Sequence, residues 1–530
     1  MGRQIRFLTP THSISATKVG ARLIPMLLAA IGFALLAAPT MAQGPWPGQS
    51  GNAVGFAAAP GWTGSFNTSA CPSSPASGSS WSNATVVSNC TYTSASLTIS
   101  CNYCEFLQVD FKGTSGGGNW NLSGSHMLFL GDRFQSNETV ATNTSVLGTY
   151  IYFFYDSFVP LASLQASPPG SLWPSAGAGS NSTMMTSGVN DTPAASGYQF
   201  SMTPQGGSGP TWVDHCDMWG FANSVDFLSS TAQITFTNNW VHDPRDPVQF
   251  TDHTDGVGYL NGATAPDNVL IAGNTIALLG TTQGLALQAA TGGYQNIYVN
   301  ENFLSGDGAT VAFCHPGSVQ CTNSTLYGNV YGTDIPPGDE GGIGNPIYDA
   351  GSTMGSGTIW ACNTISVRSG TSWTSSTGWT PIMTMNGQYF TNASAPSSVT
   401  DQGLNTVCAI TSPAAINFGN QGTGASSAGQ TITLSNTNVG VLSISSIALA
   451  TGTQFSITSN TCGSTLLAGA SCSITVEFSP TSLGPQTDTL KIVDNAPGMG
   501  SPQLVPLAGF AVASSGTPPN PPTAVIAVLD

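Results

Sequence analysis

Charged residues are scarce in this chain of 530 residues, since only 6% are Asp, Glu, Lys or Arg. Nine Lys and Arg stand against 25 Asp and Glu, which gives a formal net charge of −16 at pH 7. Because phosphate contacts need clustered Lys and Arg, this balance excludes a nucleic-acid-binding protein. Long helical patterns are also absent, and Gly, Ser, Thr and Asn are abundant. With 40% hydrophobic residues the chain is too apolar for disorder, so the composition indicates an all-β protein with many turns.

Long apolar runs are rare as well, and the one clear run extends from Leu23 to Ala38. Four basic residues precede it and the small-residue stretch Thr40 to Ala42 follows it. This layout predicts a signal peptide over residues 1–42 that is cleaved on export. A retained anchor is the alternative, because the run approaches the ~20 residues that a membrane span needs. We therefore expect a secreted or cell-surface protein without a membrane span after cleavage.

All eleven cysteines follow the predicted signal peptide. In an exported chain they can form disulfides, and an odd number leaves at least one thiol unpaired. The most closely spaced pairs are the best candidates: Cys314 with Cys321, Cys462 with Cys472 and, across a longer loop, Cys71 with Cys90. A metal-thiolate site at Cys101 and Cys104 is disfavoured, because no second pair lies at a suitable spacing.

A repeat occupies the middle of the chain. Each copy has two mostly apolar positions two apart, then Asn three residues later, then an apolar residue two further on. The repeated asparagines are Asn239, Asn274, Asn302, Asn329 and Asn363, and upstream copies place Asp132, Asp156 and, loosely, Asp217 there. A single copy is too small to bury its own apolar face. Stacked coils with parallel strands solve this, and the repeated Asn can form a ladder through them.

An antiparallel sandwich is the alternative for this region, but the recurrence of Asn at one register argues against it. Residues 98 to 370 resemble the right-handed parallel β-helix proteins of the pectin lyase-like superfamily. We therefore predict an all-β fold with a right-handed parallel β-helix over residues 98–408. Residues 43–97 are expected to cap its first coil, because terminal repeats need covering.

After Cys408 the chain shows strand-like segments separated by turn residues, which predicts an Ig-like β-sandwich over residues 409–512. The runs Asn417 to Gly419, Leu434 to Asn436 and Val476 to Pro480 resemble Ig-like repeats of the choice-of-anchor D or ASPM/SPD-2/Hydin type. The resemblance implies an accessory, spacing or attachment module without catalytic residues. Residues 513–530 form a Pro-rich tail.

Polar residues concentrate in the fourteen positions from His242 to Asp255, which hold two of the six histidines, four aspartates and Arg245. If residues 251–259 form a strand, His253 and Asp255 share one face. His253 can then act as a proton shuttle or sugar ligand beside the Asp255 carboxylate. Such a density of charge in so uncharged a chain predicts a functional site.

Aligning the strand that follows each repeated Asn places four residues in one outward column, namely Asn223, Asp255, Gln283 and Asp307. Asp255 and Asp307 lie two coils apart, so their backbones are expected about 9.6 Å apart. Inverting glycosidases hold their carboxyl groups about 6.5 to 9.5 Å apart. This column predicts Asp255 and Asp307 as catalytic carboxylates, with Asn223 and Gln283 as substrate-binding neighbours.

The stretch His253 to Gly256 resembles the Asn-Thr-Asp-Gly strand of the polygalacturonase branch, with His in place of Asn. The chain departs from that branch because Gln283 stands where paired aspartates are expected, and because the Gly-His-Gly and Arg-Ile-Lys motifs are missing. The resemblance implies hydrolysis of a polysaccharide. His242, Asp252 and His215 are further candidates for substrate binding.

Two other functions stay open from the sequence. Calcium-assisted β-elimination would use Arg245 as the catalytic cation, with Asp243 and Asp246 as hard oxygen ligands for Ca²⁺, the one cofactor indicated. A non-catalytic surface or adhesion protein that binds glycans is the third possibility. In each case the expected partner is a polysaccharide or surface glycan, and the chain is expected to be a monomer.

Overall fold

The computed structural model describes an all-β protein with long parallel sheets and a smaller, mostly antiparallel part. The residues that it describes are 53–114, 119–136, 144–161, 200–204, 210–219, 223–226, 233–242, 255–259, 267–277, 283–288, 294–305, 309–315, 321–332, 347–348, 359–366, 368–369, 372–373, 380–381, 400–401, 407–437, 440–496 and 502–514. The predicted signal peptide lies outside these residues. Two 3₁₀ turns, η1 (Phe56–Ala58) and η2 (Trp81–Asn83), are the helical segments among them. None of the described helices is long and apolar enough to cross a membrane.

Three sheets form the larger part of the chain, and their strands pair in parallel except β30 with β33, which is antiparallel. The first sheet contains β1 (Thr85–Ser88), β4 (Asn102–Leu107), β7 (Ser125–Leu130), β10 (Thr149–Phe154), β13 (Thr211–Asp214), β16 (Ile234–Thr237), β19 (Asp267–Ala272), β22 (Tyr294–Asn300), β25 (Cys321–Thr322), β26 (Thr325–Tyr327), β29 (Ile359–Ala361) and β34 (Thr400–Asp401). The second contains β2 (Thr91–Ser94), β5 (Asp110–Gly113), β8 (Arg133–Ser136), β11 (Ser157–Pro160), β14 (Asp217–Trp219), β17 (Trp240–His242), β20 (Thr275–Ala277), β23 (Phe303–Ser305), β27 (Val330–Gly332), β30 (Thr364–Ser366) and β33 (Thr380–Pro381). The third contains β3 (Ser96–Ile99), β6 (Asn119–Leu122), β9 (Thr144–Val146), β12 (Phe200–Pro204), β15 (Asn223–Asp226), β18 (Asp255–Tyr259), β21 (Gln283–Gln288), β24 (Ala309–His315) and β28 (Ile347–Tyr348).

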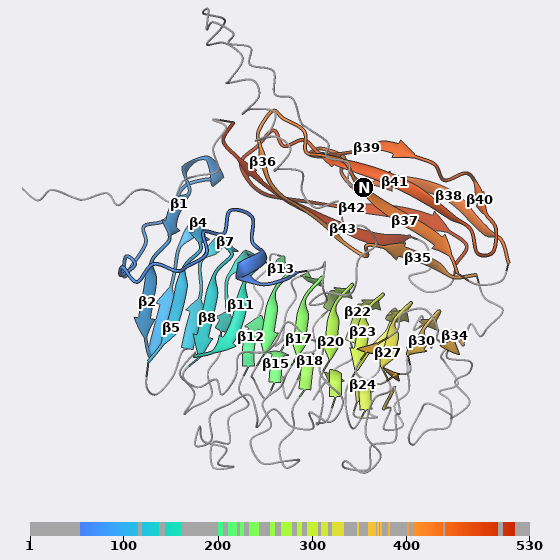
Figure 1. Cartoon of the computed structure of the whole chain (residues 1–530), viewed down its shortest axis with the longest axis horizontal. Helices are drawn as coiled ribbons and strands as arrows, with labels where there is room; N and C mark the ends of the chain where they lie inside the picture. The colour runs from blue at the N-terminus through green and yellow to red at the C-terminus, as the bar shows by residue number, and fades with distance from the viewer. Residues whose placement is uncertain are drawn as a thin grey trace, which may run out of the picture. The chain divides into compact units, whose positions relative to one another are not determined.

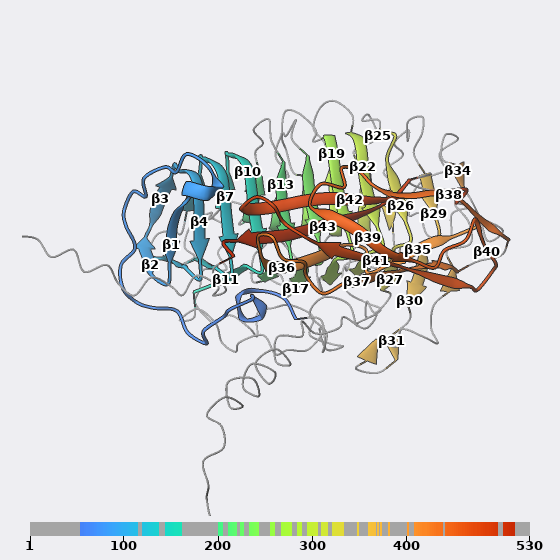
Figure 2. The same cartoon turned by 90° about the horizontal axis from the view of Figure 1, so that it is seen from above.

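Successive turns of the chain add one strand to each sheet, so β1, β2 and β3 pair with β4, β5 and β6 in parallel. The strands of successive coils lie side by side in chain order (Figure 1), and the first sheet shows the same order from above (Figure 2). These sheets are the stacked coils that the repeat predicts. The first coil begins at Thr85, inside the segment 43–97 that the sequence assigns to a cap. A short hairpin of β31 (Arg368–Ser369) and β32 (Ser372–Trp373) lies outside the three sheets.

A ladder of asparagine side chains runs through the coils at the bend between the first and second sheets. In each step the backbone N–H and Nδ2 of one Asn donate to Oδ1 of the next. The distances are 2.8 and 3.0 Å from Asn239 to Asn274, 2.9 and 2.9 Å from Asn274 to Asn302, 3.1 and 2.9 Å from Asn302 to Asn329, and 2.9 and 3.0 Å from Asn329 to Asn363. All five residues are buried. The predicted ladder is therefore confirmed.

Two aspartates and a cysteine continue this ladder toward the N-terminus. Asp132 Oδ1 accepts a backbone N–H at 2.6 Å, Asp156 Oδ1 accepts the Asp132 N–H at 2.7 Å, and the Cys216 N–H donates to Asn239 Oδ1 at 2.8 Å. Cys216 thus holds the ladder position, and the assignment of Asp217 to it was wrong by one residue. The thiol of Cys216 is small enough for this buried position, and Asp217 is the first residue of β14.

The two ladder aspartates are buried carboxyl groups. Burial raises the pKa of Asp132 and of Asp156 well above the ordinary range, and Oδ2 of each has no hydrogen-bond partner among the described residues. A buried carboxylate would carry a large desolvation cost, whereas a neutral carboxyl group resembles an Asn amide in shape. Asp therefore fits this ladder in its protonated form.

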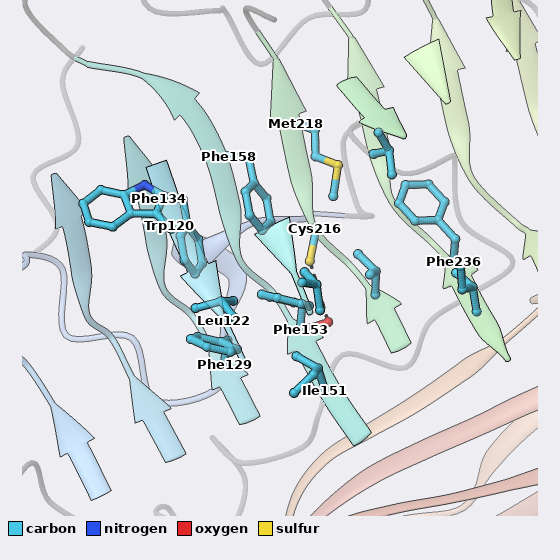
Figure 3. Packing of buried hydrophobic residues seen from close by; sticks show 14 of the residues in the cluster. Trp120, Leu122, Phe129, Phe134, Ile151, Phe153, Phe158, Cys216, Met218 and Phe236 are labelled. Carbon is cyan, nitrogen blue, oxygen red and sulfur yellow. Dashed lines mark hydrogen bonds between the residues drawn. The ribbon is translucent and has the colours of Figure 1, made fainter. Parts of the chain in front are cut away.

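Aromatic side chains fill the interior of the first coils. Rings from successive coils stack face to face in two rows, with centroid distances of 4.7 Å for Phe106–Phe129, 4.8 Å for Phe129–Phe153, 4.4 Å for Phe111–Phe134 and 4.7 Å for Phe134–Phe158. These distances match the ~4.8 Å between neighbouring strands. Figure 3 shows Phe129 and Phe153 of one row and Phe134 and Phe158 of the other, with Cys216 and Met218 in the same core. This packing fixes which residues of each strand face inward.

The second part of the chain is a β-sandwich. One sheet contains β35 (Ala409–Ser412), β37 (Gln430–Asn436), β41 (Ser471–Phe478) and β39 (Phe455–Asn460). The other contains β36 (Ile416–Gly422), β43 (Gln503–Val512), β42 (Gly484–Asp494), β38 (Leu442–Leu449) and β40 (Thr465–Leu466). All pairs are antiparallel except β36 with β43. Both sheets contribute to one apolar core that includes Leu434, Ile474, Leu490 and Leu507.

Residues 408–417, which we call the seam, bond to bends of successive coils. Cys408 is disulfide-bonded to Cys362, the Ala409 N–H donates to Tyr327 Oη at 2.8 Å, and the Thr411 N–H donates to Glu301 Oε1 at 2.8 Å. Asn417 Nδ2 then donates to Asp214 Oδ2 at 2.9 Å. Later residues of the seam therefore bond to earlier coils of the chain. The seam thus joins the sandwich to the coils through one disulfide and several hydrogen bonds.

Disulfides join four pairs of described cysteines, namely Cys71–Cys90, Cys101–Cys104, Cys362–Cys408 and Cys462–Cys472. The predicted pairs Cys71–Cys90 and Cys462–Cys472 are confirmed. The side chains of Cys314 and Cys321 lie outside the described part of the structure. Among the described cysteines Cys216 is free, and it is buried in the ladder.

Candidate functional site

The outer face of the second sheet carries polar and aromatic side chains at β14 and β17. The register pairs Asp217 with Trp240 and Trp219 with His242. The residue between each pair, Met218 or Val241, is 0% exposed and belongs to the core. Because alternate residues of a strand face opposite sides, the four paired residues lie on the outer face.

Asp217 and His242 form a hydrogen-bonded pair across these strands. His242 Nε2 lies 2.8 Å from Asp217 Oδ1. The His242 side chain is 0% exposed, whereas 21% of the Asp217 side chain is exposed. The Trp240 ring stacks on the imidazole with a centroid distance of 3.5 Å and an interplanar angle of 15°. The pair therefore presents its carboxylate to solvent and keeps its imidazole behind it.

This arrangement suits proton transfer at Asp217. A carboxylate that is partly exposed can exchange a proton with a ligand, and a bonded imidazole fixes the orientation of that carboxylate. His242 is fully buried, and this burial does not support the predicted contact of His242 with a substrate. Asp217 was not predicted for the site, because it was assigned to the ladder position that Cys216 holds; the residue after a ladder position lies on the outer face.

The N-terminal segment lies beside this carboxylate. The Gly55 N–H donates to the His215 carbonyl at 2.8 Å, and the Phe56 N–H donates to Ser157 Oγ at 3.2 Å. A Cβ at Gly55 would overlap Ser157 Oγ and lie 2.8 Å from Asp217 Cβ, and the φ of Gly55 is 75°. Only glycine therefore allows the segment to pass this close. It forms one wall next to Asp217.

A second His–Asp pair lies at the seam. His215 Nδ1 is 2.7 Å from Asp214 Oδ2, and the Asp214 carboxylate also accepts hydrogen bonds from Thr237, Asn238 and Asn417. Burial alone would raise the pKa of Asp214, but His215 and these donors hold it below its ordinary value. With only 2% of its side chain exposed, His215 is a packing residue here. This burial does not support the predicted substrate-binding role of His215.

The third sheet tests the predicted outward column. Asp255 pairs with Gln283 as expected, and the pairing of Val225 with Val257 agrees with the alignment of Asn223 to Asp255. Gln283 pairs with Ala309, however, so the alignment with Asp307 was wrong by two residues. β24 begins at Ala309, so Asp307 precedes the strand and cannot pair within it.

The direction of this column also differs from the expectation. Val225, Val257 and Leu285 are buried in the core, at most 2% exposed. Alternation places position 255 on the same face of β18 as Val257, which is the inner face. The side chains of Asn223, Asp255 and Gln283 lie outside the described part of the structure. The strand geometry therefore gives no support to an outward column.

The other predicted site residues precede β18 or β24 in stretches outside the described residues, namely Asp243, Arg245, Asp246, Asp252, His253 and Asp307. The segment 243–254 that holds five of them connects His242 at the end of β17 to Asp255 at the start of β18. Among the described residues no group of three or more His, Cys, Asp or Glu is placed to hold a metal ion.

Comparison with known proteins shows similarity to parts of this chain. No curated protein matches this chain. Among solved structures, the VesB protease and the secreted serine protease VesC of Vibrio cholerae match at 19% and 16% identity, with TM-scores of 0.16 and 0.17. These matches cover 18% and 20% of this chain, and 29% and 23% of the proteases.

The third match is an ASH/PapD-like domain of human CEP192, at 14% identity and a TM-score of 0.18, covering 22% of this chain and 92% of that domain. Residues 405–501 also match the family model "abnormal spindle-like microcephaly-associated, ASPM-SPD-2-Hydin", abbreviated ASH. The sandwich of this chain is thus an Ig-like ASH domain, as the sequence resemblance predicted.

Proposed function

We propose that this chain is an exported carbohydrate-active protein of the pectin lyase-like superfamily that cleaves a polysaccharide by hydrolysis. The observation that carries the proposal is the Asp217–His242 pair, in which a partly exposed carboxylate is bonded to a buried imidazole on the outer face of a parallel sheet. The stacked coils and the Asn ladder support the superfamily, and the disulfides support export.

The reaction needs a second polar group beside Asp217. The chain leaves the site at His242 and immediately enters the segment 243–254, whose aspartates and His253 are the groups predicted from the sequence. In this proposal Asp217 exchanges a proton with the glycosidic oxygen or with a water, and a carboxylate of this segment is its partner. His242 keeps the Asp217 carboxylate oriented through the 2.8 Å bond.

A non-catalytic glycan-binding protein is the second candidate, and one observation favours it. His242 is fully buried and stacked on Trp240, an arrangement that also stabilises an outer sheet face without any reaction. In that case the same face binds glycan without cleaving it.

A product assay separates these functions. The purified chain is incubated with neutral and acidic polysaccharides, and both new reducing ends and the absorbance of unsaturated products are followed. Hydrolysis gives reducing ends without absorbance, and this is the expected result. Absorbance that rises with the reducing ends would show β-elimination and contradict hydrolysis. If neither signal rises while a glycan still binds, the protein is a binder.

A further inference from the structure

A row of outward-facing residues crosses the second sheet and passes through Asp217. The first residues of β5, β8, β11, β14 and β17 pair in register, so the row consists of Asp110, Arg133, Ser157, Asp217 and Trp240. Neighbours in such a row lie about 4.8 Å apart, and the next outward residue of the same strand lies about 7 Å away. A polymer that lay across the coils at Asp217 would follow this row.

The N-terminal residues 55–71, which we call the strap, cover this row on one side of Asp217. The contacts of the strap move from one coil to the next, namely Cys71 disulfide-bonded to Cys90, the Gly61 carbonyl accepting from Gln108 Nε2 at 2.6 Å, the Phe66 ring under the Arg133 guanidinium, and the Phe56 N–H donating to Ser157 Oγ at 3.2 Å. The strap therefore extends from the first coil to Gly55, whose backbone passes directly beside Asp217.

Asp217 is an open position among buried neighbours. Of its side chain, 21% is exposed. In the row, Ser157 on one side is 1% exposed and Trp240 on the other is 6% exposed. Along the chain, His215 at the bend is 2% exposed, and Trp219, the next outward residue of β14, is 3% exposed. The accessible surface at this carboxylate is thus bounded in all four directions of the sheet.

These buried neighbours restrict how a polysaccharide can reach Asp217. An internal stretch of a sugar chain would have to continue past the carboxylate on two sides. It would therefore have to lie over Ser157 under the strap and over Trp240, and neither residue offers an open surface. The end of a chain needs room in one direction only, and that direction can lead away from the sheet.

We propose that Asp217 acts on the end of a polysaccharide chain and releases a short sugar from it, and that Gly55 and Phe56 of the strap enforce this choice. The inference rests on the proposed function. The step breaks the glycosidic bond that joins the terminal unit to the chain. The hydroxyl group of a water bonds to the anomeric carbon, and a proton goes to the departing oxygen. Each cleavage therefore releases one small product and shortens the chain only at its end.

Product analysis with the full chain tests the proposal. The probes are polygalacturonate, a soluble xylan and a soluble arabinogalactan, and new reducing ends are counted while size-exclusion chromatography follows the length of the polymer. We expect one short product from the first time point and a residual polymer of nearly unchanged length. A ladder of intermediate lengths with an early fall in polymer length overturns this inference and leaves hydrolysis standing. The absence of new reducing ends from every probe overturns both proposals.

A loosened strap tests the role of its end. The double variant Phe56→Ala, Ser157→Ala removes the ring that packs against Trp62 and Phe66, together with the hydroxyl that accepts the backbone N–H of residue 56. Thr63→Val is the matched control, because it removes an exposed hydrogen bond of the strap to Gln108 and leaves the end at Gly55 unchanged.

We expect the products of the double variant to shift from the short sugar to a ladder of lengths, whereas the control keeps the wild-type pattern. A double variant that releases only the short sugar at an unchanged thermal midpoint overturns the role of the strap. If the double variant does not fold, the products of the wild-type chain still decide between cleavage at the end and cleavage within the polymer.

Discussion

Replacing Glu301 by Gln tests how the ASH domain is held on the coils. Burial raises the pKa of Glu301 from 4.5 to about 7, although the Thr411 N–H and hydroxyl bond to its carboxyl group at 2.8 and 2.7 Å. The folded chain therefore holds this proton more tightly than the unfolded chain. The stabilisation is complete below about pH 4.5 and is lost as the pH rises through about 7. One pKa unit corresponds to about 1.4 kcal/mol, so the loss at higher pH amounts to about 3 kcal/mol.

Glutamine keeps the shape and the hydrogen-bonding atoms of Glu301 without a charge to bury. Glu301→Gln should therefore raise the free energy of unfolding by about 3 kcal/mol at pH 8 and leave it unchanged at pH 4. The assay is urea denaturation at both pH values with the disulfides intact, combined with hydrogen exchange of the Thr411 amide. The exchange of that amide should slow at pH 8 in the variant.

Glu105→Gln is the matched control, because burial raises the pKa of Glu105 to about 7 as well and its side chain lies in the first sheet. At pH 8 the control should show the same rise in the free energy of unfolding as Glu301→Gln. Hydrogen exchange of its Thr411 amide should slow only as far as global unfolding becomes rarer. The same pH dependence of unfolding in wild type and Glu301→Gln would refute the reasoning.

Three further changes test the ladder and the seam. Asp132→Asn should raise the denaturation midpoint at pH 8 and not at pH 3, because an amide replaces a carboxyl group whose raised pKa makes ionisation costly. Asn302→Ala removes the hydrogen bonds to Asn274, to Asn329 and to a buried backbone carbonyl. Each buried group left without a partner costs about 1 to 3 kcal/mol, so urea titration should show the free energy of unfolding lowered by about 3 kcal/mol or more. The double variant Cys362→Ser, Cys408→Ser removes the disulfide that closes a loop of 46 residues, and it should lower the free energy of unfolding by about 4 kcal/mol in the same titration. An unchanged midpoint would contradict a stabilising role of this disulfide at the seam.

The fold could be predicted where the same contact recurs in every coil and therefore places the same residue type at a regular position in the sequence. A buried Asn in each coil must donate to and accept from its neighbours, so Asn239 to Asn363 recur at one register and reveal the stacking. The ladder position at Cys216 could not be predicted, because the buried thiol fills the space of the Asn side chain but is not the polar residue by which the repeat was identified. The adjacent Asp217 was taken in its place.

The candidate site was harder to predict, since its geometry depends on contacts between coils. The pairing of His242 with Asp217 spans 25 residues, and the seam bond from Asn417 to Asp214 spans 203. Neither leaves a local pattern in the chain. The alignment of Asp307 failed because a shift of two residues in the start of a strand leaves its alternation unchanged.

The activity of Asp217→Asn tests the central proposal most directly. The amide keeps the shape of the side chain and a hydrogen bond to His242, so the fold is preserved while the carboxylate is lost. On the polysaccharide that wild type cleaves fastest, the variant should release reducing ends at least about 100-fold more slowly, the lower range for loss of a general acid or base. Glu105→Gln should cleave at the wild-type rate below pH 7. A variant Asp217→Asn that retains more than half of the wild-type rate at an unchanged thermal midpoint would contradict the assignment of this site.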